Sequence, residues 1–275
     1  MQVNKEIRVS GLRRSGNHAI INWIVQQHNN EYIFINNVQP YQDPFDFTKQ
    51  KKRNTSLFVY SYEDVPVSYI YNPKYMNDKK CRYDIIHQDI YNVLIIRNPL
   101  NLFASRLKSD KIGVGSKIYN DKDLWIMYAQ EYLGFTNFIN SDKILINYDK
   151  WFIDVKYRKI IANQLGLKFT DKGMDDVPQF GGGSSFDDLN FDNKGSSMRV
   201  LERWKSFQGN KKYERFIKDK VLISLLKEIY CLDRDAEIYL DSFKSYETCI
   251  NSLFSGVRRN MFQPLMRLKK ELDIK

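Results

Sequence analysis

The sequence predicts an α/β fold of three layers, α/β/α, around a mainly parallel central sheet, with a helical extension at the C-terminus. Short apolar runs suited to buried strands alternate with longer segments of helical periodicity, and this alternation is typical of parallel sheets. The expected strands cover residues 6–11, 31–35, 56–61, 92–97 and 143–148, and the expected helices cover residues 16–29, 99–110, 121–140 and 154–166.

The chain changes character after these elements. Residues 175–194 are rich in Asp, Gly, Ser and Asn, a composition that predicts a connector or lid without regular structure. Helices are expected again over residues 198–207 and 211–230. We therefore expect an α/β domain over residues 1–240 and a helical extension over residues 241–275.

Composition narrows the function classes. The chain has 275 residues, of which 43% are hydrophobic and 14% aromatic, enough to fill the core of one α/β domain. Its net charge of +10 suits a polyanionic ligand, an acidic acceptor or an anionic surface. The sequence carries no DNA- or RNA-binding motif, so we do not expect a nucleic-acid partner.

The cysteines and the hydropathy pattern bear on location. Cys81, Cys231 and Cys249 are odd in number and lack metal-ligand spacing, which favours reduced thiols and no bound metal. No apolar run approaches the roughly 18 residues of a membrane span, and the first expected strand leaves no room for a signal peptide. A cytoplasmic location is the expectation.

The first motif is a strand, a tight basic turn and the start of a helix over residues 7–20. Gly11 and Gly16 have the spacing of a P-loop, whose backbone N–H groups and helix N-terminus hold an anion. Nucleotide-hydrolysing P-loops continue with Lys and Ser or Thr, but this chain has Asn17 and His18. The loop is therefore predicted to bind anions without magnesium.

The second motif follows a buried apolar strand, residues 92–96. Arg97 stands at its carboxyl end, where ligands bind in open α/β sheets. Asn98 and Pro99 are suited to the N-cap and first turn of a helix, which places Ser105 about two turns into it. Arg97 and Ser105 are expected to bind one phosphate together.

These two motifs resemble those of the sulfotransferase family, which has a strand, a Lys-Ser-Gly turn and a helix, and later Arg-Asp/Asn-Pro followed by Ser. Weaker similarities extend the resemblance over roughly residues 5 to 210, at residues 124–128, 144–149, 160–168, 194–195 and 203–207. The resemblance implies a P-loop-like fold and 3'-phosphoadenosine 5'-phosphosulfate as sulfuryl donor, with no metal required. The implied nucleotide-binding residues are Arg13, Arg14, Ser15, Gly16, Asn17, His18, Arg97, Ser105, Lys194 and Gly195.

The resemblance also suggests catalytic residues. Arg14 stands in place of the family's Lys; it keeps the charge but cannot donate a proton. The family carries its base shortly before a Pro at the end of the third strand, where this chain has Glu63 and Asp64 ahead of Pro66. Glu63 is the better placed, although both carboxylates could instead cap the next element. His18, at a helix start, is a further candidate base.

The expected reaction transfers a sulfuryl group to a hydroxyl or an amine of a saccharide, a glycolipid or another small acceptor. A P-loop nucleotide or small-molecule kinase is an alternative, with Asp149 as its candidate magnesium ligand, and a non-catalytic nucleotide binder is another. Acceptor loops vary, and residues 37–54 and 65–90 carry no recognisable acceptor code.

Apolar and basic residues interleave in the C-terminal tail, over residues 254–270. Such a pattern suits either peripheral contact with an anionic membrane or a helix docked on the domain. Pro264 interrupts the helical pattern, and we favour docking.

Overall fold

The computed structural model describes residues 2–28, 30–39, 42–48, 55–72, 86–109, 120–139, 143–179 and 183–243. The predicted extension over residues 241–275 therefore lies outside the described residues from position 244 onward. Within the described residues, no helix is both long and apolar enough to cross a membrane.

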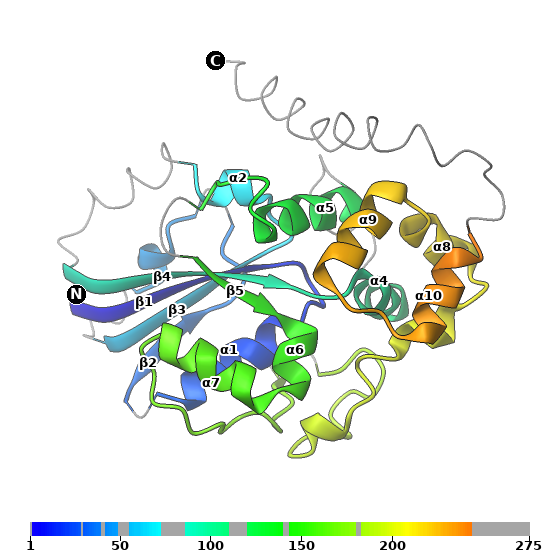
Figure 1. The fold of residues 1–275 in the computed structure, drawn as a ribbon. Helices are drawn as coiled ribbons and strands as arrows, with labels where there is room; N and C mark the ends of the chain where they lie inside the picture. The colour runs from blue at the N-terminus through cyan, green and yellow to red at the C-terminus, as the bar shows by residue number, and fades with distance from the viewer. Residues whose placement is uncertain are drawn as a thin grey trace.

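The described strands form one five-stranded parallel sheet in the order β2-β3-β1-β4-β5, which confirms the predicted α/β fold (Figure 1). The strands are β1 (Gln2–Gly11), β2 (Tyr32–Ile35), β3 (Thr55–Glu63), β4 (Ile86–Ile96) and β5 (Lys143–Asn147). Central β1 places Gly11 beside Glu63 of β3 and Ile95 of β4. The last residues of these three strands thus meet at one edge of the sheet.

Helices cover both faces of the sheet, giving the predicted three layers. One core joins the sheet to α1 (Asn17–Gln26), α6 (Tyr148–Ile153) and α7 (Val155–Gln164). The opposite core joins it to α2 (Val67–Ile70), α4 (Pro99–Lys108) and α5 (Asp121–Tyr132). Side chains alternate along β4, so Val93 and Ile95 enter the first core while Leu94 and Ile96 enter the second.

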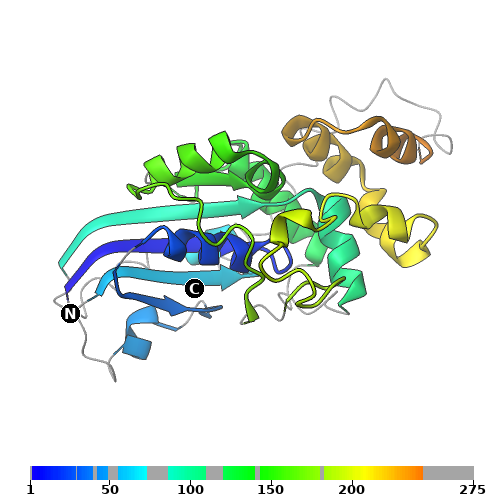
Figure 2. The same cartoon turned by 90° about the horizontal axis from the view of Figure 1, so that it is seen from below.

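The C-terminal helices extend the second core. They are α8 (Lys211–Ile217), α9 (Lys220–Ile229) and α10 (Arg234–Asp241), and Figure 2 shows them beyond the carboxyl ends of the strands. Buried Tyr213 of α8 donates a hydrogen bond from its hydroxyl to the Leu100 carbonyl of α4 over 3.0 Å. These helices therefore pack on the α/β layers through the same core.

Several predicted boundaries were wrong, each for a local reason. Strand β4 begins six residues early because it pairs with an equally extended β1 from Gln2 onward. The helix predicted to reach residue 140 ends at Tyr132, shortly before Gly134 adopts a left-handed φ of 78°. Asn147 caps α6, so the predicted last strand residue, Tyr148, instead begins this helix, and Asp154 caps the separate helix α7.

The later segments also differ from expectation. Residues 198–207 contain a 3₁₀ turn, η4 (Arg203–Phe207), rather than an α-helix, and residues 211–230 form two helices. The described part of the predicted connector, residues 175–194, is irregular, as expected, with one isolated bridge between Ser184 and Asp188; a 3₁₀ turn, η3 (Gly195–Ser197), follows it directly.

Asp219 explains the break between α8 and α9 and allows a stability test. Its side chain accepts a hydrogen bond from the Leu222 amide over 3.0 Å and pairs with Lys122 over 2.6 Å. We expect Asp219→Ala to lower the free energy of unfolding by about 1 kcal/mol, since it removes an N-cap. Asp219→Asn should retain most of the stability because Asn also caps, and the ion pair is partly exposed. Urea denaturation of both variants measures this; equal losses would contradict the capping role.

Candidate functional site

The loop between β1 and α1 wraps tightly around the end of the sheet. Gly16, the N-cap of α1, has a φ of 85°, and a Cβ added to it would lie 2.1 Å from the Tyr148 ring. Arg14 also has a left-handed φ, of 69°. Gly16 therefore meets both a conformational and a steric requirement, and the first N–H groups of α1 lack intrahelical acceptors. This is the predicted anion loop.

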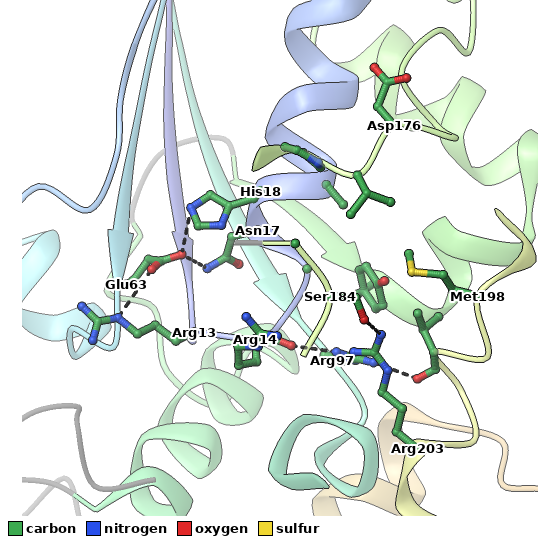
Figure 3. A pocket seen from close by; sticks show the side chains of 17 residues that line it. Arg13, Arg14, Asn17, His18, Glu63, Arg97, Asp176, Ser184, Met198 and Arg203 are labelled. Atoms are coloured by element: carbon green, nitrogen blue, oxygen red, sulfur yellow. Dashed lines mark hydrogen bonds and ion pairs between the residues drawn. The ribbon is translucent and has the colours of Figure 1, made fainter. Parts of the chain in front are cut away.

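A cavity of about 250 Å³ opens at this loop, close to the lower limit of about 300 Å³ typical of small-molecule sites. Its walls come from the loop, the start of α1, the end of β3, the residue after β4, and the segment around residues 176–203. Of the residues predicted from sequence, it is lined by Arg13, Arg14, Gly16, Asn17, His18, Glu63 and Arg97 (Figure 3).

Arg97 ties the walls of the cavity together. Its guanidinium donates to the Arg14 carbonyl over 2.8 Å and to the Val200 carbonyl over 2.7 Å. The same group lies 4.8 Å from the centre of the Tyr148 ring, a cation–π contact. Its Nη1 is also 3.5 Å from Ser105 Oγ, so the structure brings the predicted Arg97 and Ser105 together.

Arg203 reaches the same serine from the other side. Its Nη1 donates to Ser105 Oγ over 3.1 Å, and its Nη2 donates to Ser184 Oγ over 2.7 Å. Phe186 lies under the guanidinium, with 4.8 Å between Cζ and the ring centre. Arg97 and Arg203 thus form a pair of buried cations that share one hydroxyl.

Arg14, Arg97 and Arg203, the arginine group of the cavity, have few carboxylates in ion-pair contact among the described residues. Burial, together with the charge of Arg97, lowers the pKa of Arg14 and lowers the pKa of Arg203 to about 10. Among the described residues, no carboxylate forms an ion pair with Arg14 or Arg97, and Arg203 has Asp187 at 3.7 Å. An anion bound between these guanidinium groups would relieve their repulsion.

A second group lies on the other side of the loop. The Glu63 carboxylate accepts a hydrogen bond from Asn17 Nδ2 over 3.0 Å, with Arg13 Nε at 3.5 Å and His18 Nε2 at 3.8 Å. His18 Nε2 also lies 2.9 Å from Asn36 Oδ1. Figure 3 shows this group on one side of Arg14, and Arg97 and Arg203 on the other. The cavity therefore has a cationic end and an end that carries a carboxylate and an imidazole.

Asp64, the alternative base, does not line the cavity. Its carboxylate accepts from the Arg13 amide over 2.9 Å and pairs with fully buried Arg106, which also donates to the Arg13 carbonyl over 3.1 Å. Arg106 further pairs with Asp121, at the start of α5, over 2.8 Å. Burial raises the pKa of Asp64, against the opposing effect of Arg106. This network holds the backbone of the loop at Arg13, and of the two carboxylates only Glu63 lines the cavity.

The remaining predicted residues are dispersed. Ser15 is 1% exposed, and its hydroxyl has no hydrogen-bond partner among the described residues. Lys194 is exposed, and Gly195 packs against Asp175, so neither lines the cavity. Asp149, the candidate magnesium ligand, is also absent from the lining; it accepts from the Asn98 amide over 2.8 Å, and burial raises its pKa.

Several lining residues lie outside the predicted site, and among them Tyr148, Ser184 and Arg203 bear polar groups that contact the cavity's other residues. Arg203 had a signal, since it opens the Arg-Trp-Lys-Ser-Phe segment already noted for its resemblance. Tyr148 likewise lies in the segment of residues 144–149 noted for its resemblance, whereas Ser184 had no signal, because it reaches the cavity through the folding of a distant segment.

Comparisons with protein-family models and with curated proteins find no match for this sequence. Among solved structures, the chain is similar to mouse sulfotransferase SULT7A1 complexed with PAP, with 14% identity, a TM-score of 0.47 and coverage of 81% of this chain and 88% of that one. It is similar to the sulfotransferase domain of the Synechococcus PCC 7002 olefin synthase, with 12% identity, a TM-score of 0.47 and coverage of 84% and 96%.

A sulfotransferase domain from the curacin biosynthetic pathway is similar at 12% identity and a TM-score of 0.42, with coverage of 78% of this chain and 97% of that one. At such identities and scores, the function of the chain has to be argued from its own residues.

The arginine group makes a prediction that does not depend on the identity of the ligand. Inorganic pyrophosphate should raise the thermal midpoint of unfolding at constant ionic strength, because it binds the folded state. Arg203→Met should reduce this rise, while Lys205→Met, which removes a neighbouring exposed cation, should preserve it. Thermal denaturation of the three proteins measures the shifts. Equal shifts in all three would show that the ion does not bind between the arginines.

Proposed function

We propose that the chain is a sulfotransferase that uses 3'-phosphoadenosine 5'-phosphosulfate as its donor. The observation that carries the proposal is the pairing of two anion-binding positions at one cavity. The loop around Gly16 suits the 5'-phosphosulfate, and Arg97 with Arg203 suits the 3'-phosphate. Ser105, which both guanidinium groups contact, lies buried behind them and does not line the cavity. A plain adenylate would leave the second position without an anion.

Several features of the cavity and its surroundings support the binding of such a nucleotide. Ser15 Oγ and Arg97 Nε are buried and have no hydrogen-bond partner among the described residues, although buried polar atoms are normally paired. The left-handed Gly16 lets the Tyr148 ring, which also lines the cavity, approach the backbone of the loop. Burial and then the charge of Arg97 lower the pKa values of Arg14 and Arg203, and Arg97 and Arg203 share one hydroxyl, so a dianionic phosphate between the three guanidinium groups would be stabilised electrostatically.

When bound, the nucleotide would supply an activated sulfuryl group. Arg14 would neutralise charge on the leaving phosphate oxygen as a permanent cation, without donating a proton. Glu63 would accept the proton of the acceptor as the acceptor oxygen or nitrogen attacks sulfur. Glu63, at the end of β3, and Arg14, in the loop after β1, line the same cavity, which suits an attack in line with the leaving group.

The proposed acceptor is a hydroxyl or an amine of a saccharide, a glycolipid or another small molecule. The proposed cytoplasmic location and the membrane contact of residues 254–270 rest on the sequence pattern alone. A kinase is less well supported, because Asp149 is engaged by the Asn98 amide and Asn17 and His18 replace the P-loop Lys and Ser or Thr.

The donor proposal predicts discrimination by the 3'-phosphate. Adenosine 3',5'-bisphosphate should bind more tightly than adenosine 5'-phosphate, and Arg97→Ala should remove about 1.5–3 kcal/mol of that preference by deleting a charge-assisted hydrogen bond. Isothermal titration calorimetry with both nucleotides on wild type and variant gives the four affinities. Equal affinities in the wild-type protein would refute the donor assignment.

Replacing Glu63, the proposed base, should affect the transfer reaction and not nucleotide binding. Glu63→Gln should lower turnover by about 10²-fold or more while the affinity for adenosine 3',5'-bisphosphate stays nearly unchanged, because the amide cannot accept a proton. Transfer from labelled donor to a panel of saccharides, glycolipids and phenols measures turnover. If the variant transferred as fast as wild type, the base would have to be another residue, and His18 would be tested next.

A further inference from the structure

The side chain of Asn17 is held in one orientation by two acceptors. Its Nδ2 donates to Glu63 Oε1 over 3.0 Å and to the Leu12 carbonyl over 3.1 Å. A carbonyl and a carboxylate can only accept, so the amide nitrogen must lie on this side and Oδ1 on the other. Asn17 is 3% exposed, which leaves it little room to rearrange.

Gly11 provides the space that this orientation requires. A Cβ added to Gly11 would lie 2.2 Å from Asn17 Oδ1 and 2.9 Å from its Cγ. Gly11 has no left-handed φ, so its backbone would accept an alanine. The close approach of Asn17 is therefore the specific reason for a glycine at the end of β1.

The contact acts on the torsion that aims the Glu63 carboxylate. The terminal torsion of a glutamate is broad and roughly two-fold, so a carboxylate without fixed partners samples many orientations. Asn17 engages Oε1, whereas the nearest cation to Oε2, Arg13 Nε, lies 3.5 Å away, beyond a good hydrogen bond. Among the described residues, Asn17 thus provides the one short hydrogen bond to the Glu63 carboxylate.

We propose that Asn17 is a positioning residue that aims the Glu63 carboxylate at the acceptor, rather than a ligand of the donor phosphate. This inference rests on the proposed function, with Glu63 as base. Asn17 is also the first residue of α1, directly after Gly16. The loop that holds the donor and the carboxylate that takes the proton therefore keep a fixed relation through one side chain.

The test compares turnover with donor affinity. Asn17→Ala should lower kcat about 10- to 100-fold, the loss typical of a misplaced reactive group, while the Kd for adenosine 3',5'-bisphosphate changes less than about threefold. Gln27→Ala is the matched control. Gln27 is an equally buried amide of the α1 end, bonded to Thr170 and Asp171, far from the cavity lining. It should lose stability without losing kcat per folded molecule.

Two further variants at this contact show whether a loss of kcat in Asn17→Ala comes from the lost hydrogen bond or from misfolding. Asn17→Asp keeps the size and suits a helix N-terminus, but it replaces the donor with a like charge beside Glu63, so its kcat should fall at least as far. Gly11→Ala should displace Asn17 and reproduce its loss. In the double variant Gly11→Ala/Asn17→Ala the two losses should not add, since both break the same contact.

The outcomes distinguish the positioning role of Asn17 from the proposed role of Glu63 as base. Undiminished turnover in Glu63→Gln would overturn both the base and its positioning residue. Loss of turnover in Glu63→Gln with wild-type kcat in Asn17→Ala and Asn17→Asp would overturn the positioning role alone. A Kd raised more than tenfold in Asn17→Ala with kcat intact would identify Asn17 as a donor ligand and would also overturn the inference.

Discussion

The guanidinium of Arg97, at the carboxyl end of the sheet, is the contact on which the arrangement of the cavity depends. It bonds to the carbonyls of Arg14 in the loop and Val200 near the C-terminal helices, and it lies against Tyr148 of α6. Its own carbonyl accepts a hydrogen bond from buried Trp125 of α5 over 2.9 Å. One residue thus joins four segments, and the cavity is the space that they enclose.

Arg14, Arg97 and Arg203 bring positive charge together at the cavity, and the described residues supply few carboxylates in ion-pair contact with them. Arg97 uses its donors on carbonyls rather than carboxylates, and the pKa values of Arg14 and Arg203 are lowered, first by burial and then by the charge of Arg97. Burying like charges together costs free energy unless a partner of opposite charge arrives. Arginines that repel one another in this way are suited to bind a ligand with more than one phosphate-like group.

Local sequence patterns predicted the parts of the site that lie near one another along the chain. The distance from Arg97 to Ser105 is set by two helical turns, and the Gly11–Gly16 turn by its own glycines, so both could be inferred from spacing. Arg106 gave no such signal. It supports the loop through Asp64 and Asp121, and only the packing of α4 against the sheet edge brings these charges together.

Helix and strand ends were the least predictable features for a similar reason. Tyr148 continued an apolar strand pattern, yet Asn147 accepts hydrogen bonds from the amides of Asp149 and Lys150 and thereby begins a helix. That change turns the ring toward Gly16 and Arg97. A capping side chain outweighed hydrophobic periodicity at this point, and the result shaped the site.

The structure of the protein bound to adenosine 3',5'-bisphosphate tests the central claim most directly. The account predicts the 3'-phosphate within hydrogen-bond distance of Arg97, Ser105 or Arg203, and the 5'-phosphate on the backbone amides around Gly16. A nucleotide bound outside this cavity, or one whose 3'-phosphate faces solvent while the arginines keep their present partners, would contradict it.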